Sequence, residues 1–588
     1  MTSEVGAPTP YKAPVDEIMT ALDVAGISSL LNLPVFSHVD LDTVRSLLEE
    51  FARIAESDIA NGDRIGDVHG AVLDQSTGTV RVPDEFKKAY DAYVSGGWGT
   101  LSVPEQYGGG GFPAVVSSAL QEFFASANMA LSLNPVLTQG SIEALIQWGT
   151  PDQQELFLSK LTTGEWSGTM NLTEPQAGSD LGAIRTMATA QSDGTWAISG
   201  TKIFITWGEH ELAENIVHLV LARTPDAPAG TKGLSVFLVP KYAVNVDGTL
   251  GERNTLRAVS LEHKLGIHAS PTCVMEFSGA TGFLVGPLHG GMKVMFTMMN
   301  NARLAIGVQG PASAERAFQH ALDYARTREQ GSAATVKPPQ SAPIIEHPDV
   351  QRMLLQMSTT TIAARLLIFQ AVVYKDLAHY SDDETVRSHA QFMVDLLTPV
   401  AKAWSTDRGF ETTSLAVQVF GGAGFIEESG IAQRLRDARI APIYEGTNGI
   451  QSLDLVFRKI PSGDGHLIDQ FFDDVAKSLV ELRSNSTLAP CVDQVENGLA
   501  TLRSTTHWML DAVKNAPRDA QAGATAYLEM FGAVLASWQL LCRASKSSDA
   551  SERRSLEAEF FTLEYLAPSV ARASAITAGA KRLGGLAY

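Results

Sequence analysis

The hydrophobic period of the chain changes twice, and this limits the folds that the chain can adopt. From residue 14 to about residue 164, and again from residue 291, apolar residues recur at the spacing of one helix face. Between these regions, short runs rich in β-branched and aromatic residues are bounded by Gly, Pro and Asn, which is typical of strands. The sequence therefore predicts helices on both sides of a compact β domain.

The β domain is expected from about Glu165 to Val285. Its clearest signal is a hairpin in which residues 186–190 and 196–205 flank Asp193-Gly194, a dipeptide favoured in tight turns. Further strands are predicted at residues 216–222, 234–239 and 273–277. Because strand follows strand without an intervening helix, we expect antiparallel pairing.

At 588 residues the chain is too long for one hydrophobic core. The predicted fold class is α+β, mainly α. We expect an N-terminal helical domain over residues 1–164, a central antiparallel β domain over 165–285, a helical bundle over 286–460 and an additional C-terminal helical domain over 461–588. The sequence PSGDG at residues 461–465 has the composition of a linker between the last two.

Five helices are predicted in the third domain, at residues 292–303, 312–328, 350–375, 385–410 and 411–420. Residues 331–346 carry Pro and Ser and are expected to form a loop. In the fourth domain, Pro490, Pro517 and the polar residues 547–551 separate four amphipathic stretches, which predicts an added helical bundle.

The net charge of −20 argues against nucleic acid or an anionic membrane as a partner. Cys273, Cys491 and Cys542 lie too far apart for a metal motif or a disulfide framework. The N-terminus has no basic-then-apolar signal pattern, and residues 526–542 are shorter than the roughly 20 residues of a membrane span. We therefore expect a cytoplasmic protein without a bound metal.

Residues 441–459 set one carboxylate, Glu445, in a loop before a helix. Thr447 is expected to cap this helix, because apolar residues recur at helical spacing after it. The N-terminus of a helix also favours negative charge, so a carboxylate and an anion could both be held here. The alternative is a surface glutamate followed by a capped helix.

Three other segments have residues that could bind a ligand, although each also has an ordinary structural interpretation. Residues 170–180 place the hydroxyls of Thr173 and Ser179 around a Pro-Gly turn, which suits a polar heterocycle or a pyrophosphate. Residues 204–207 end a strand with two aromatic side chains beside a hydroxyl, either a flat surface for a ring system or strand-end core. Residues 418–425 join an amide to two glycines but lack the last glycine of a dinucleotide fingerprint.

In combination, these motifs resemble the acyl-CoA dehydrogenase family over about residues 11–459. The motifs that carry the resemblance, in chain order, are MNLTEPQAGSD, FITWG, KLGIHASPT, MNNARLAIG, YARTREQG, QVFGGAGF and IYEGTNGIQ. The PYKAPVDEIM start, the GEHELAEN segment and the extra C-terminal helices are similar to the longer subgroup that acts on 3-(methylthio)propanoyl-CoA.

The resemblance implies FAD as cofactor, an acyl-CoA substrate, an electron-transfer flavoprotein as electron acceptor, and a homodimer or dimer of dimers. It implies that Glu445 is the catalytic base. The implied cofactor-binding residues are Met170, Leu172, Thr173, Ser179, Phe204, Thr206, Arg328, Gln418, Gly421, Gly422, Thr447 and Asn448. The implied substrate-binding residues are Ser179, Asn300, Arg303, Tyr444 and Gly446.

Two positions depart from the family pattern. The motif around Arg328 lacks the phenylalanine common before its glycine, and Gly449 stands where many relatives have glutamine. The methionines of residues 292–299 are interpreted as core rather than as a substrate channel.

The implied chemistry explains the residue types. A proton α to a thioester is weakly acidic, so its removal requires a base in a dry pocket and donors for the developing enolate. The family resemblance assigns these donors to the Glu445 N–H and a flavin ribityl hydroxyl.

Three alternatives remain open at this point. One is an acyl-CoA oxidase that passes electrons to oxygen. Another is a DNA-associated flavoprotein of the same superfamily, which the nearly balanced charge of residues 461–588 disfavours. The third is a scaffold that has lost activity, which the retained Glu445 disfavours.

Overall fold

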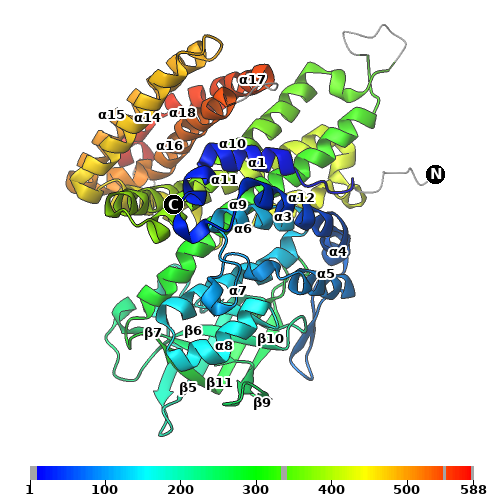
Figure 1. Ribbon diagram of the computed structural model, residues 1–588, viewed down its shortest axis with the longest axis vertical. Coiled ribbons are helices and arrows are strands. Elements are labelled where there is room, and N and C mark those ends of the chain that lie inside the picture. The colour runs from blue at the N-terminus through cyan, green and yellow to red at the C-terminus, as the bar shows by residue number, and fades with distance from the viewer. Residues whose placement is uncertain (1–8, 333–340, 547–550, 585–588) are drawn as a thin grey trace. The chain divides into compact units, whose positions relative to one another are not determined.

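The computed structural model describes residues 9–332, 341–546 and 551–584 (Figure 1). It divides into two compact units. The helical unit comprises residues 1–49, 113–126 and 306–588, and the sheet unit comprises residues 50–112 and 127–305. Residues 333–340 of the predicted loop at 331–346, and residues 547–550 of the polar break at 547–551, lie outside the described residues.

Seven strands of the described chain form the main sheet of the sheet unit. They are β3 (Trp166–Asn171), β4 (Met187–Ala190), β5 (Trp196–Thr206), β6 (Asn215–Arg223), β7 (Leu234–Pro240), β10 (Leu256–Leu261) and β11 (Thr272–Val285). The order is β10-β11-β5-β4-β6-β3, and β7 pairs with both β11 and β6. The predicted hairpin is confirmed, because β4 and β5 pair antiparallel with Met187 opposite Ser199.

The expectation of a purely antiparallel sheet was wrong. β3 runs parallel to β6, and β4 also meets β6 in parallel at Met187. These strands are not joined by a hairpin, so the connection does not impose an antiparallel direction. Sequence analysis also missed β3, β10 and two small ribbons, β1 (Val72–Asp74) with β2 (Thr79–Arg81) and β8 (Tyr242–Val244) with β9 (Leu250–Arg253). The first ribbon interrupts a region predicted to be helical.

The part of the sheet formed by β3, β6 and β7 is buried on both faces. Along β6, Val217 and Leu219 belong to one hydrophobic cluster, whereas Val220 and Ala222 belong to the other. Successive side chains of a strand point to opposite faces, so this continuous apolar run serves two cores. Helices α7 (Met129–Trp148) and α8 (Pro151–Thr163) both contact β3. Met295 and Met298 are fully buried in the first cluster, which confirms their interpretation as core.

The long helices are more continuous than predicted. One helix, α9 (Gly291–Thr327), replaces the two expected around Pro311, and α11 (Glu384–Phe420) replaces another pair although Pro399 lies inside it. Within the helical unit, a Cβ on Gly409 would lie 2.5 Å from the Gly310 carbonyl oxygen. Such close packing between α9 and α11 compensates for the hydrogen bond that each proline removes.

The C-terminal bundle contains the four predicted amphipathic stretches. They form α14 (His466–Leu482), α15 (Ala489–Asn515), α16 (Pro517–Ser545) and α17 (Ser551–Phe561), followed by the short α18 (Ala567–Val570) and α19 (Ala573–Thr577) (Figure 1). Pro490 and Pro517 lie in the first turns of α15 and α16, where proline is tolerated. Helix α16 packs on α10 (Pro348–Tyr380), α11 and α13 (Asn448–Asp454).

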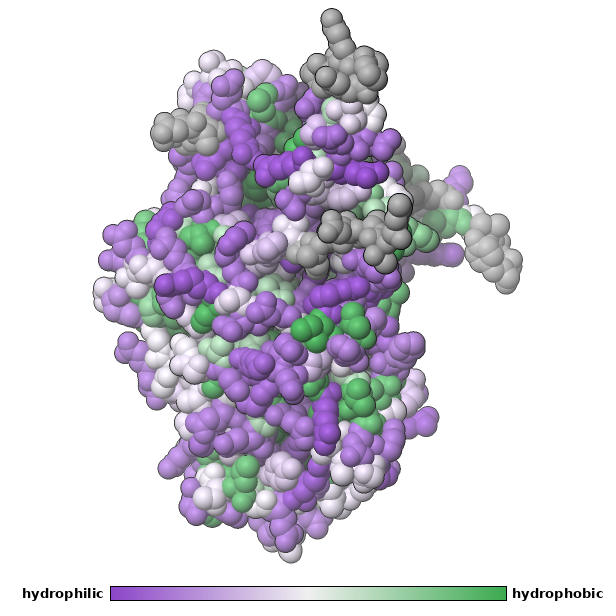
Figure 2. Space-filling model, turned by 90° about the vertical axis from the view of Figure 1, so that its right-hand side faces the viewer, coloured by the Kyte–Doolittle hydropathy of each residue, from purple (hydrophilic) through white to green (hydrophobic). Residues whose placement is uncertain are grey.

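Helix α10 is, among the described residues, the one helix long and apolar enough to cross a membrane. Within its most apolar window, 94% of the residues are buried inside the protein. Its hydrophobicity is therefore accounted for by core packing. The face of the molecule in Figure 2 is mainly hydrophilic, with apolar residues in small scattered groups.

Candidate active site

The loop before α13 holds Glu445 in an unusual backbone conformation. Glu445 has a φ of 54° and Gly446 a φ of 86°, so two consecutive residues are left-handed. A side chain in this region is sterically unfavourable, whereas glycine adopts it freely. Thr447 caps α13 as predicted, its hydroxyl accepting from the Ile450 N–H at 3.3 Å. Glu445 is partly buried and lies outside the helix.

Two buried side chains hold the carbonyl groups of these left-handed residues. The Gln451 amide donates to the Glu445 oxygen at 3.4 Å and to the Gly446 oxygen at 3.3 Å. The Lys402 ammonium, on α11, also donates to the Gly446 oxygen, at 2.9 Å. Gln451 and Lys402 are both fully buried. The main chain that presents Glu445 is therefore fixed from within the helical unit.

The side chain of Asn448 is committed to α11. Its oxygen accepts from Lys402 Nζ at 2.9 Å, and its amide nitrogen donates to the Ala403 carbonyl at 3.0 Å and to Asp407 Oδ1 at 2.8 Å. The side chain therefore anchors the loop to α11. The cofactor-binding role of Asn448 stays a prediction.

Tyr444 directly precedes Glu445 in the chain, and its hydroxyl forms a hydrogen bond within the helical unit. Its hydroxyl donates to Gln309 Oε1 on α9. Burial raises the pKa of Tyr444 well above its ordinary value, so the phenol is neutral at physiological pH. The ring therefore contributes an apolar surface next to the carboxylate.

In the sheet unit, the structure brings together the predicted residues of two segments. The Ile203 N–H donates to the Thr173 carbonyl at 2.9 Å, and the Thr169 hydroxyl donates to the Thr206 carbonyl at 2.7 Å. Residues 169–173, which include Met170 and Leu172, thus lie beside residues 203–206. Phe204 has a φ of 59° and is 57% exposed, so its ring projects from the end of β5. Trp207, by contrast, is strand-end core.

A buried ion pair supports this region. Lys202 donates to Glu174 Oε1 and to the Leu172 carbonyl, both at 2.9 Å. Glu174 also accepts from the Arg185 and Thr186 N–H groups and from the Thr186 hydroxyl. The turn that continues to the exposed Ser179 is therefore ordered by a carboxylate whose charge is already neutralised.

Two glycines in the predicted site are not required by the packing of the chain itself. A Cβ on Gly178 or on Gly422 would meet nothing within 4 Å, and neither residue has a positive φ. Gly421 has a φ of 60° and is equally open. Gly178 lies in the turn before Ser179, and Gly422 follows the exposed Gln418 at the end of α11. Both positions fit the close approach of another molecule.

The other predicted residues lie on α9 or directly after it. Arg303 is buried and donates to Asn300 Oδ1 at 3.4 Å, so these two residues are together in the sheet unit. Arg328 follows the last residue of α9 and is exposed. Arg328, Gln418, Gly421 and the Glu445 loop belong to the helical unit, whereas residues 169–173 and 203–206 belong to the sheet unit.

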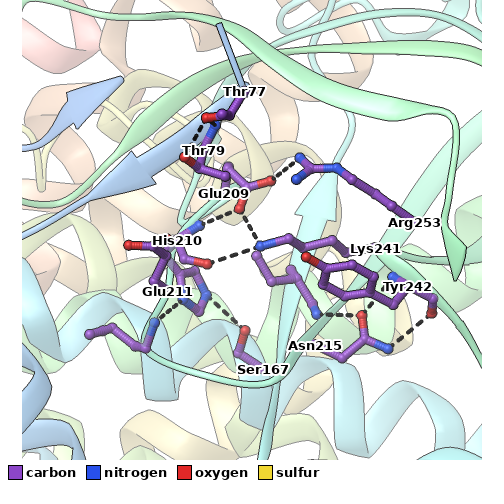
Figure 3. A network of polar contacts seen from close by, with 12 residues as sticks. Thr77, Thr79, Ser167, Glu209, His210, Glu211, Asn215, Lys241, Tyr242 and Arg253 are labelled. Carbon is purple, nitrogen blue, oxygen red and sulfur yellow. Dashed lines mark hydrogen bonds and ion pairs between the residues drawn. The ribbon is translucent and has the colours of Figure 1, made fainter. Parts of the chain in front are cut away.

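The GEHELAEN segment after β5 forms a buried polar network in the sheet unit (Figure 3). Glu209 pairs with Lys241 and with Arg253, the latter at 3.0 Å. The Leu212 N–H donates to His210 Nδ1, so the other ring nitrogen donates to Ser167 at 2.9 Å. Burial lowers the pKa of His210 well below its ordinary value, which keeps the ring neutral. This network fixes the strand end.

Sequence reasoning did not identify four of the residues that shape the site: Glu174, Lys202, Lys402 and Gln451. Glu174 and Gln451 lie inside motifs that were quoted for other residues. A signal for Lys402 was present, because a lysine within the apolar run LLTPVAKAW must be buried with partners. No group of three or more His, Cys, Asp or Glu side chains in residues 9–332, 341–546 and 551–584 could hold a metal ion.

The sequence matches four family models. They are the N-terminal domain of acyl-CoA dehydrogenase over residues 71–165, its middle domain over 169–280, its C-terminal domain over 289–459, and the acetyl-CoA dehydrogenase C-terminal-like domain over 467–586.

Two curated proteins and one solved structure are similar over most of the chain. A 3-methylmercaptopropionyl-CoA dehydrogenase of Ruegeria pomeroyi is 46% identical, over 95% of this chain and 96% of its own. A broad-specificity linear acyl-CoA dehydrogenase, FadE5 of Mycobacterium tuberculosis, is 36% identical over 83% and 82%. The crystal structure of a Bacillus anthracis acyl-CoA dehydrogenase complexed with FAD has a TM-score of 0.71 at 22% identity, covering 98% and 91%, respectively.

Proposed function

The chain belongs to the acyl-CoA dehydrogenase family, and we propose that it oxidises 3-(methylthio)propanoyl-CoA, or a similar short or medium acyl-CoA, to the trans-2-enoyl-CoA, with Glu445 as base. The observation that carries the assignment of the base is the Glu445 loop. The backbone of Glu445 is left-handed there. The buried side chains of Gln451 and Lys402 hold it by donating to the main-chain carbonyls of Glu445 and Gly446.

Members of this family depend on FAD, and the chain has residues that fit it. Phe204 offers an exposed aromatic surface beside the main chain of residues 169–173. Gly178 leaves room in the following turn, and Glu174 there is neutralised by Lys202, so it would not repel a pyrophosphate. Met170, Leu172, Thr173, Ser179, Phe204 and Thr206 would hold the cofactor, together with the main chain of Thr447 and Asn448. When bound, FAD supplies the acceptor that takes the β-hydrogen of the acyl chain as hydride.

The residues of the chain perform the acid–base half of the reaction. Glu445 removes the proton α to the thioester, and Tyr444 provides an apolar neighbour that strengthens the base by excluding water. The main-chain N–H of Glu445 donates to the thioester oxygen as negative charge develops on it. Asn300 and Arg303 bind the CoA portion of the substrate in this proposal. Arg303 supplies a positive charge for a CoA phosphate.

The proposed substrate is supported by the 46% identity to the Ruegeria pomeroyi protein, which spans nearly both chains. The FadE5 relative acts on linear acyl-CoA substrates in general, so chain length is the open variable. An electron-transfer flavoprotein is the proposed acceptor, and the cytoplasm is the proposed location.

The proposed assembly is a homodimer or dimer of dimers. The openness around Gly421 and Gly422, and the 91% exposure of the adjacent Phe425, support a neighbouring subunit there. In that arrangement Arg328 and Gln418 would reach the FAD of the neighbouring subunit.

A substrate series tests the proposal. The purified enzyme is assayed anaerobically with 3-(methylthio)propanoyl-, butanoyl- and octanoyl-CoA and an artificial electron acceptor, and the enoyl product is identified by mass. We expect the highest kcat/KM with the sulfur-containing substrate. A clear preference for butanoyl- or octanoyl-CoA would contradict 3-(methylthio)propanoyl-CoA as the main substrate and leave the other short or medium acyl-CoA thioesters, and rapid peroxide formation in air would favour an oxidase.

A further inference from the structure

We propose that Lys402 is a positioning residue, which sets the place of the Glu445 carboxylate by holding the main chain around it. This inference rests on the proposed function, in which Glu445 is the base. Lys402 does not contact the reacting atoms in the proposal. It acts through the backbone of Gly446 and the side chain of Asn448.

Lys402 connects both sides of the turn that follows Glu445. Its Nζ lies 2.9 Å from the Gly446 oxygen and 2.9 Å from Asn448 Oδ1, and the residue is fully buried. Asp407 accepts from the nitrogen of the same Asn448 amide at 2.8 Å, which fixes the orientation of that amide. One ammonium group therefore holds the carbonyl before Thr447 and the side chain after it.

The backbone needs such support because it is strained. A glutamate with a φ of 54° is followed by a glycine with a φ of 86°, and the direction of the Glu445 side chain depends on both. Gln451 contacts the same two carbonyls but only at 3.3 Å and 3.4 Å, close to the limit of a hydrogen bond. The shorter, charge-assisted bond to Gly446 comes from Lys402.

The C-terminal bundle packs against the part of α11 that carries Lys402. Trp404, two residues further along α11, packs so closely on α16 that a Cβ on Gly532 would lie 2.4 Å from its ring. Arg408, one turn later, is 3.8 Å from Glu529 of α16. The added bundle thus contacts the same part of α11 whose Lys402 holds the Glu445 loop.

The test compares Lys402→Met with wild type, with Glu445→Gln and with Lys241→Met. Lys241 is also buried and ion-paired, but its partners are Glu209 and the His210 carbonyl in the network of Figure 3. Each FAD-loaded protein is mixed anaerobically with saturating substrate, and the rate of flavin reduction is recorded from pH 6 to 9. FAD content, substrate KM and Tm are measured in parallel.

We expect Lys402→Met to reduce flavin at least tenfold more slowly, with KM within twofold of wild type, full FAD content and a shifted pH profile. Lys241→Met is expected to lower Tm while the rate stays at the wild-type value. A lower Tm with an unchanged rate and pH profile for Lys402→Met would overturn the proposal. If that variant does not fold, Lys402→Ala, which also lacks an N–H donor, is measured instead, and a wild-type rate and pH profile would overturn the proposal equally.

The role of Glu445 as base and the positioning role of Lys402 are tested separately. If Glu445→Gln is inactive and Lys402→Met retains the full rate, only the positioning role is wrong. If Glu445→Gln retains the wild-type rate, the assignment of the base is wrong, and the role of Lys402 falls with it.

Discussion

Lys202 and Glu174 form a buried ion pair, with Nζ and Oε1 2.9 Å apart, beneath the segment that carries Leu172 and Thr173. Lys202 also donates to the carbonyls of Leu172 and Leu221, and thereby ties the end of β3 to β6. Burial lowers the pKa of Lys202 to about 8, so the ammonium group remains protonated at pH 7. The pair is thus a support for the predicted cofactor site.

Removing the charge of Glu174 should destabilise the protein strongly. The Glu174→Gln variant leaves the Lys202 ammonium buried without an opposite charge, which typically costs about 3–5 kcal/mol. We expect a lower urea midpoint and a loss of FAD during purification. The double variant Glu174→Gln with Lys202→Met should recover much of the stability, because both charges are gone. A single variant as stable as wild type would contradict this view of the pair.

The same ion pair predicts that the stability of the folded protein depends on pH in the acidic range. Burial alone would raise the pKa of Glu174, but Lys202, Thr186 and the Arg185 N–H outweigh it and lower the pKa to about 2, from an ordinary 4.5. Between these values the unfolded chain binds more protons than the folded chain, so the stabilisation is complete above about pH 4.5 and is lost as the pH falls towards 2.

We therefore expect the Tm difference between wild type and Glu174→Gln to shrink steadily below pH 4.5. Thermal unfolding of both proteins from pH 7 to 3 measures it. A difference that stays constant over this range would show that the charge of Glu174 is not the cause.

The hydrogen bond from Tyr444 to Gln309 joins the Glu445 loop to α9. Tyr444→Phe leaves the buried Gln309 oxygen without this donor, which should cost about 1–3 kcal/mol in urea unfolding. A double-mutant cycle with Gln309→Leu isolates the bond, since removal of both polar groups should cost less than the sum of the single changes. Strict additivity would mean that the two side chains do not interact.

Gly532 on α16 should resist enlargement. Gly532→Ala places a methyl group 2.4 Å from the Trp404 ring, and overpacking of this kind costs about 1–3 kcal/mol. Alanine favours a helix over glycine by about 1 kcal/mol, so the net loss is smaller. Gly140→Ala on α7 is the matched control, because its Cβ would meet Met298 at an ordinary 3.5 Å. We expect the control to unfold at a Tm equal to or above wild type, and a Gly532→Ala variant that does the same would contradict the packing.

Local patterns predicted much of the fold. The Asp193-Gly194 hairpin, the cap at Thr447 and the helix starts near Pro490 and Pro517 depend on neighbours in the chain, and all are present. The parallel pairing of β3 with β6 depends on strands distant in sequence, which no local pattern specifies. The predicted breaks near Pro311 and between residues 410 and 411 were wrong for a related reason, because tertiary packing keeps both helices continuous.

The same distinction applies to the site. Glu445 could be selected as a loop carboxylate from its neighbours alone, but its buried supports lie elsewhere in the sequence. Lys402 and Gln309 come from α11 and α9, and their contacts exist only once the helices pack. The roles of the cofactor-binding and substrate-binding residues stay predictions that rest on the family resemblance.

We propose above that Glu445 is the base that removes the α-proton of the acyl-CoA substrate. The most direct test is an anaerobic titration of the FAD-loaded protein with 3-(methylthio)propanoyl-CoA, wild type beside Glu445→Gln, followed by the visible absorbance of the oxidised flavin. We predict that the substrate bleaches the wild-type flavin and leaves the spectrum of the variant oxidised, although both proteins contain FAD. Equal bleaching of the two proteins would contradict the role of Glu445, and no bleaching of wild type by this or any other thioester would contradict the proposed activity.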